Sequence, residues 1–173
     1  MAGAADKLAA LTGGANLNEE QTAFLEKLSA LIDELKPKQL SLDKLSGRVR
    51  ATRKRESVVQ LTIPHLSDSH LELGVAVEPH AIVVGYGSYD HIHFGYGEPD
   101  PPTADALPFI RALFEGRVEV VITYGWVWTN VKTFQINVSG QRVRIQSGST
   151  PAMFAGGWKW PPRIKETRRL SFA

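Results

Sequence analysis

Apolar residues alternate with polar ones through most of the chain after Ser57, and this two-residue period restricts the folds open to it. Successive side chains of a strand point to opposite faces, so such runs predict strands with one buried face. The alternating sets are Val59, Leu61 and Ile63; Leu71, Leu73, Val75 and Val77; Ala81 to Tyr86; His91 to Tyr96; Val118 to Trp128; Phe134, Ile136 and Val138; and Val143 and Ile145. Sheets with one apolar and one polar face are typically antiparallel, with helix on the apolar face.

Two segments carry helical spacing instead. Apolar residues recur at that spacing from Asn18 until Pro37 ends the pattern, and Gln21 can reach back to Asn18 in a capping box. A shorter helix is predicted between a cap near Asp105 and Gly116. The sequence therefore predicts an α+β fold with an N-terminal amphipathic helix and an antiparallel, meandering sheet of about seven strands, interrupted by the second helix.

The predicted organisation is a flexible lead over residues 1–17, one α+β domain over 18–148 and a C-terminal arm over 149–173. The arm is rich in proline, glycine, aromatic and basic residues, and we expect it to be irregular. No apolar run approaches the ~20 residues of a membrane span, and the start lacks an apolar stretch of signal-peptide length. These features favour a cytoplasmic protein with no membrane contact.

Charge and cysteine content narrow the chemistry. The chain has no cysteine, which excludes disulfides, thiolate zinc sites and cysteine nucleophiles. Its net charge of +2 conceals blocks of opposite sign: +7 over residues 36–55, −7 over 65–120 and +4 over 159–169. Such blocks more often indicate solvated faces and charge complementarity within the chain than binding sites.

The segment from Gly85 to Gly97 holds the most distinctive cluster of aromatic and histidine residues. A hairpin that turns between Gly87 and Asp90 is expected to place its tyrosines and histidines on the exposed face of the sheet. Tyrosine, tryptophan and arginine are enriched at protein interfaces, so the aromatic and basic arm extends the same prediction. The predicted binding surface consists of Tyr86, Tyr89, His91, His93, Trp158, Trp160 and Arg163.

A metal or acid–base site is the first alternative. His91 and His93 are two residues apart, so on a strand they share a face and can bind one divalent metal such as zinc. The candidate third ligands are Asp90, His65, His70 and His80. With or without a metal, these histidines could serve a small metal- or histidine-dependent hydrolase, although no motif supplies a nucleophile.

Nucleic-acid binding is the second alternative, because a dense basic run can hold phosphates. The run consists of Arg48, Arg50, Arg53, Lys54 and Arg55. The competing interpretation is an edge strand whose basic side chains prevent pairing with other chains. No recognition motif accompanies the run.

The absence of an assembled catalytic motif favours a protein-binding module over an enzyme, with no cofactor. In general plan the chain resembles many bacterial immunity and adaptor proteins, and the resemblance implies docking, adaptor or toxin-neutralising function without catalysis. It carries no residue-level correspondence. The partner is expected to be another protein. The apolar stripe of the first helix packs either on its own domain or on a second copy in a homo-oligomer.

Overall fold

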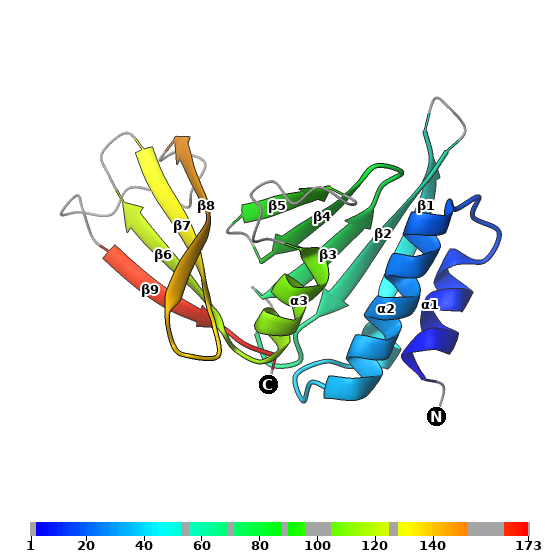
Figure 1. Ribbon diagram of the computed structural model, residues 1–173, viewed down its shortest axis with the longest axis horizontal. Coiled ribbons are helices and arrows are strands. Elements are labelled where there is room, and N and C mark those ends of the chain that lie inside the picture. The colour runs from blue at the N-terminus through cyan, green and yellow to red at the C-terminus, as the bar shows by residue number, and fades with distance from the viewer. Residues whose placement is uncertain are drawn as a thin grey trace.

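The computed structural model describes residues 3–52, 56–68, 71–87, 90–95, 105–124, 128–151 and 165–172. These residues form three α-helices and nine strands, and all strand pairs are antiparallel (Figure 1). The predicted α+β class is therefore confirmed. The strands divide between two sheets rather than forming the single meander of about seven strands that the sequence predicted.

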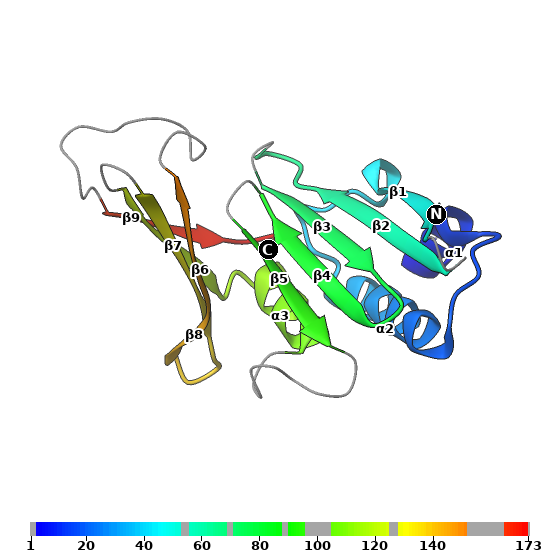
Figure 2. The same ribbon diagram turned by 90° about the horizontal axis from the view of Figure 1, so that it is seen from above.

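The first sheet is a five-stranded meander with its strands in chain order. It comprises β1 (Ser46–Ala51), β2 (Ser57–Pro64), β3 (Glu72–Val77), β4 (Ala81–Tyr86) and β5 (Asp90–Gly95). Helices α1 (Ala4–Thr12) and α2 (Glu19–Leu35) lie on one face of this sheet, and a short 3-10 helix (Leu42–Lys44) precedes β1 (Figure 1). The opposite face carries no helix among the described residues (Figure 2).

The second sheet has four strands in the order β8-β7-β6-β9. Its strands are β6 (Val118–Tyr124), β7 (Trp128–Ile136), β8 (Arg142–Pro151) and β9 (Lys165–Leu170). Helix α3 (Ala106–Phe114) contacts both β4 and β7. The second sheet lies at the β5 end of the first sheet, away from β1 (Figure 2).

The start of α2 shows how local sequence fixes an element in the fold. Asn18 Oδ1 accepts from the Gln21 backbone N–H at 2.8 Å, and Gln21 Oε1 accepts from the Asn18 N–H at 3.0 Å. This confirms the predicted capping box. The buried Gln21 amide also donates to the carbonyl oxygens of Ser57 and Val77, at 2.8 and 3.1 Å. One side chain therefore caps α2 and attaches it to β2 and β3.

The N-terminal segment differs from its prediction as a flexible lead, because residues 4–12 form α1. Ala4 and Leu8 are buried in the core, and the Ala4 N–H donates to Asp33 Oδ1 at 3.1 Å. Alanine has the highest helix propensity, so the alanine-rich composition favours this helix once α2 offers a surface to pack on.

The apolar stripe of α2 is buried within the chain. Its buried apolar residues are Phe24, Leu25, Leu28, Leu31 and Ile32. Of the two expectations for this stripe, packing on its own domain is therefore the one observed. The stripe gives no reason to expect that α2 pairs with a second copy.

The C-terminal segment also differs from its prediction as irregular, because β8 reaches Pro151 and residues 165–170 form β9. β9 pairs antiparallel with β6, with Leu170 opposite Val118. Its sequence is mostly charged, so the two-residue apolar period that identifies a strand is missing, and the pairing comes from β6. Within the described residues no helix has both the length and the apolar character needed to cross a membrane.

Candidate binding site on the uncovered sheet face

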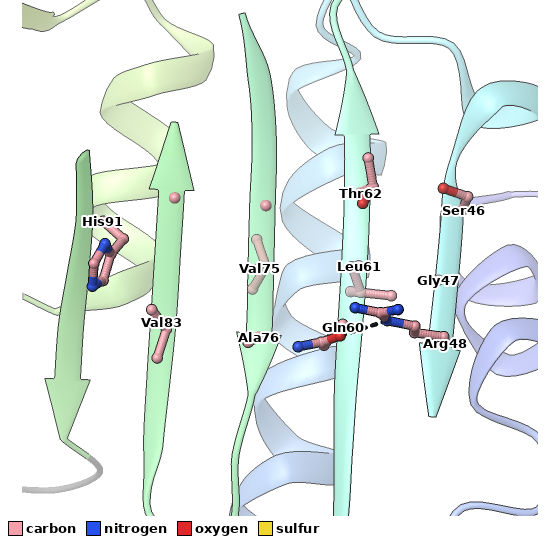
Figure 3. A pocket seen from close by; sticks show the side chains of 12 residues that line it. Ser46, Gly47, Arg48, Gln60, Leu61, Thr62, Val75, Ala76, Val83 and His91 are labelled. Atoms are coloured by element: carbon pink, nitrogen blue, oxygen red, sulfur yellow. Dashed lines mark hydrogen bonds between the residues drawn. The ribbon is translucent and has the colours of Figure 1, made fainter. Parts of the chain in front are cut away.

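The face of the first sheet opposite the helices, here called the uncovered face, alternates residue by residue with the buried face. In β2, Val59 and Leu61 point into the core, whereas Val58, Gln60 and Thr62 are partly exposed. Figure 3 looks onto the uncovered face, with the helices behind the strands. One face of this sheet is thus apolar and buried, as predicted, whereas the other is partly exposed and carries both polar and small apolar residues.

The strand registers align the residues of this face in two rows that cross all five strands. One row is Ser46, Thr62, Gly74, Gly85 and His91, and the other is Arg48, Gln60, Ala76, Val83 and His93. In both rows the residues of β3 and β4 have small side chains or none, whereas the residues at the ends of the rows have hydrogen-bonding side chains. The uncovered face is therefore shallow at its centre and raised at β1 and β5.

A shallow trough with a volume of about 440 Å³ occupies this central region. The two rows, without His93, supply most of its lining, and Gly47, Leu61 and Val75 complete the described part (Figure 3). Its described lining contains one guanidinium, one imidazole, one amide and two hydroxyl groups, but no carboxylate. The trough can therefore donate several hydrogen bonds and carries positive charge.

The trough floor contains two glycines, and the fold does not require the one at Gly74. Gly74 and Gly85 are direct cross-strand partners, and neither has a positive φ. Beyond its chain neighbours, a Cβ at Gly74 would meet nothing closer than the Gly85 carbonyl oxygen, at 4.0 Å. Glycine weakens a strand interior and often marks close approach of a ligand or another backbone. Packing within the chain thus gives no reason for a glycine at position 74 or for the open space above it.

Arg48 forms the β1 end of the trough. Its Nε donates to Gln60 Oε1 at 2.6 Å, which draws the guanidinium over the neighbouring strand (Figure 3). Among the described residues no carboxylate forms an ion pair with Arg48. Arg48 and Arg50 lie on β1 at the edge of the sheet, where charged side chains oppose pairing with another chain. Arg53, Lys54 and Arg55 lie outside the described residues.

His91 and His93 form the other end of the uncovered face. Both are exposed on the same side of β5, as predicted, and their ring centroids are 5.2 Å apart. The described residues contain no cluster of three histidine, cysteine or acidic side chains that could hold a metal. The Asp90 side chain and His70 lie outside the part that the structure describes.

His65 has a separate structural role. Its Nε2 lies 2.9 Å from the Ser171 carbonyl oxygen, and its Nδ1 accepts the Asp68 N–H at 3.0 Å. Its ring also contacts the buried Phe172 edge to face, with 4.9 Å between ring centroids. His65 thus attaches the C-terminal segment to the end of β2, and both of its ring nitrogens are engaged there.

The prediction that Tyr86 shares the exposed face with the two histidines was wrong. The register pairs Gly85 with His91, so Tyr86 points to the opposite face, where it is fully buried. Val83 and Val84 are both apolar, so the sequence left the facing of β4 ambiguous, and a one-residue shift reverses every side chain. Tyr89, Trp158, Trp160 and Arg163 lie outside the described residues.

The residues of the trough floor were not found from the sequence. The available signal was Gly74, a glycine at an outward position between the inward-pointing Leu73 and Val75. A glycine there suggests a bulge, a bend or a close approach, and only the strand register reveals Gly85 beside it.

Comparisons of the chain with models of protein families, with curated proteins and with solved structures find no match. A function for this chain therefore has to be argued from the site itself.

Proposed function

We propose that this chain is a protein-binding module that docks an extended segment of another protein in the trough on the uncovered face. The observation that carries the proposal is the floor formed by Gly74 and Gly85, which leaves open a volume of about 440 Å³. At Gly74 neither backbone conformation nor packing within the chain calls for glycine. Binding of another backbone gives that position a physical reason.

The dimensions of the uncovered face suit an extended polypeptide. Neighbouring strands lie ~4.8 Å apart, so the five strands span roughly 19 Å from β1 to β5. An extended segment of about six residues covers that distance at ~3.3 Å per residue. The polar groups of the trough can pair with backbone or side-chain groups of the segment.

The hydrolase alternative has less support from the same residues. The His91–His93 pair could contribute two ligands or an acid–base group, but the described residues bring no third ligand to it. A two-histidine arrangement leaves a zinc ion short of the three protein ligands typical of catalytic sites. The docking function does not require a third metal ligand.

Selection from a displayed library of random eight-residue peptides tests the proposal. The wild-type chain is expected to enrich peptides that bind it with micromolar affinity. Gly74→Val fills the trough and is expected to weaken their binding by roughly tenfold or more, which corresponds to about 1.4 kcal/mol. Asn130→Val, which adds similar bulk at an exposed position of β7, is the matched control and should leave binding unchanged.

Two results would contradict the docking function. One is that the wild-type chain enriches no peptide. The other is that enriched peptides bind the wild type and Gly74→Val equally well, because such peptides would occupy some other surface.

A further inference from the structure

We infer that the trough selects an acidic segment, an extended stretch of polypeptide with aspartate or glutamate side chains directed to the Arg48 end. This inference rests on the proposed docking function and specifies the chemistry of the partner. It is carried by the charge and hydrogen-bonding character of the trough, taken together with the span between its two ends.

The charges at the β1 end of the uncovered face favour a negative occupant. Arg48 and Arg50 lie on this face of β1, opposite Gln60 and Val58. Glu72 begins β3 on the same face as Gly74, and Glu78 follows the end of β3, but neither carboxylate contributes to the trough lining. An acidic segment across the floor would thus meet a cation at β1 without a carboxylate in the described lining.

The hydrogen-bond donors gather at the same end. Because Arg48 Nε already donates to Gln60, its two terminal nitrogens are the groups that can hold a carboxylate in a bidentate pair. The hydroxyl-bearing residues Ser46 and Thr62 are cross-strand partners in the adjacent row. A carboxylate at the β1 end can therefore bind the guanidinium and accept from a hydroxyl as well.

The separation of the two ends argues for a segment rather than a small anion. Arg48 on β1 and His91 on β5 both line the trough, and four strand spacings, or roughly 19 Å, separate their strands. A single carboxylate or phosphate cannot reach both ends. A segment of about six extended residues can place one acidic side chain by Arg48 and another acceptor by the β5 histidines.

A nucleic acid is also negatively charged, but an acidic polypeptide suits the lining of the trough better. Proteins that bind single strands stack the bases on aromatic side chains along a basic groove. In the described lining His91 carries the only ring, and aliphatic or glycine residues form the floor. Such a floor offers close approach to a backbone but little stacking surface.

The test compares the composition of peptides enriched by three forms of the full chain from the same random library. The wild type is expected to enrich aspartate and glutamate at least about threefold over the unselected library. Arg48→Gln, which keeps the length and polarity of the side chain, should still enrich peptides but lose the acidic bias. Arg144→Gln on β8, an exposed arginine away from the trough, should retain it.

The outcomes separate this inference from the docking function. Peptides without acidic bias that lose binding in Gly74→Val would overturn the inference and leave the docking function standing. Peptides that bind Gly74→Val unchanged, or no enrichment at all, would overturn both. A twelve-nucleotide oligo-dT that displaces the acidic peptides at equal or lower concentration would identify the trough as a nucleic-acid site and overturn the inference.

Discussion

The hydroxyl groups of Tyr86 and Thr133 lie 2.6 Å apart and join β4 of the first sheet to β7 of the second. Both residues are fully buried, and the Tyr86 ring packs edge to face on Phe109 of α3, with 5.7 Å between ring centroids. A buried hydroxyl without a partner is costly, so the hydrogen bond between these two groups stabilises the fold. The contact therefore helps to fix the relative position of the two sheets.

Removal of this hydrogen bond is expected to destabilise the fold. Tyr86→Phe leaves the Thr133 hydroxyl buried without this partner, which should lower the free energy of unfolding by about 1–2 kcal/mol in urea denaturation. Thr133→Val should have a similar effect. The double variant should be less destabilised than the sum of the two single variants, with a coupling of about 1 kcal/mol. Strictly additive effects would show that the two hydroxyls do not interact.

Gly74→Val is expected to stabilise the chain while it weakens binding. A β-branched residue is favoured in strands, and glycine carries a larger entropy cost on folding, so the free energy of unfolding should rise by about 0.5–1 kcal/mol. No close contact opposes the new Cβ, because beyond its chain neighbours the nearest atom is the Gly85 carbonyl oxygen, 4.0 Å away. Urea denaturation beside the peptide-binding measurement checks both effects. A loss of stability would mean that the fold itself requires glycine there.

The features predicted well from the sequence are those fixed by neighbouring residues. The Asn18–Gln21 capping box is one example, and Asp105 at the cap of α3 is another, since its Oδ1 accepts the Leu107 N–H at 3.3 Å. Gly116 just past α3 has a φ of +68°, the left-handed conformation expected of a glycine after a helix. Each of these three helix ends depends on residues that lie within a few positions of one another in the sequence.

The features that were missed depend on partners distant in sequence. β9 carries no apolar alternation of its own and becomes a strand because it pairs with β6, some 50 residues earlier. The facing of Tyr86 depends on the β4–β5 register, which Val83 and Val84 leave undetermined in the sequence. The trough likewise requires Gly74 and Gly85 to be cross-strand partners, a relation that no local pattern contains.

The ion pair between Glu34 and Arg111 links α2 to α3 and gives a pH-dependent prediction. Two hydrogen bonds of 2.9 and 2.6 Å from the Arg111 guanidinium lower the pKa of the Glu34 carboxyl below its ordinary value. A lowered pKa means that the contribution of Glu34 to stability is present at neutral pH and is lost as pH falls through the folded-state pKa. The effect should be small and weakened by salt, since the pair is exposed to solvent.

Titration by NMR checks this relation directly. The pKa of Glu34 should lie below the ordinary value of a glutamate carboxyl. In Arg111→Gln it should return toward the ordinary range, because the hydrogen bonds that favour the charged carboxylate are weakened. An unchanged Glu34 pKa in that variant would show that Arg111 is not the cause of the shift.

Gly116→Ala is expected to be among the more damaging small substitutions in the chain. The backbone there has a φ of +68°, which disfavours any residue with a Cβ, and the new Cβ would lie 2.6 Å from Ser171 Oγ. Ser171 must then move, although its carbonyl oxygen holds His65 and the next residue, Phe172, is buried. We expect the free energy of unfolding to fall by about 1–3 kcal/mol, measured by urea denaturation. Ser171→Gly in the same chain should recover the steric part of this loss but not the backbone part, and a full recovery would show that the left-handed conformation carries no cost.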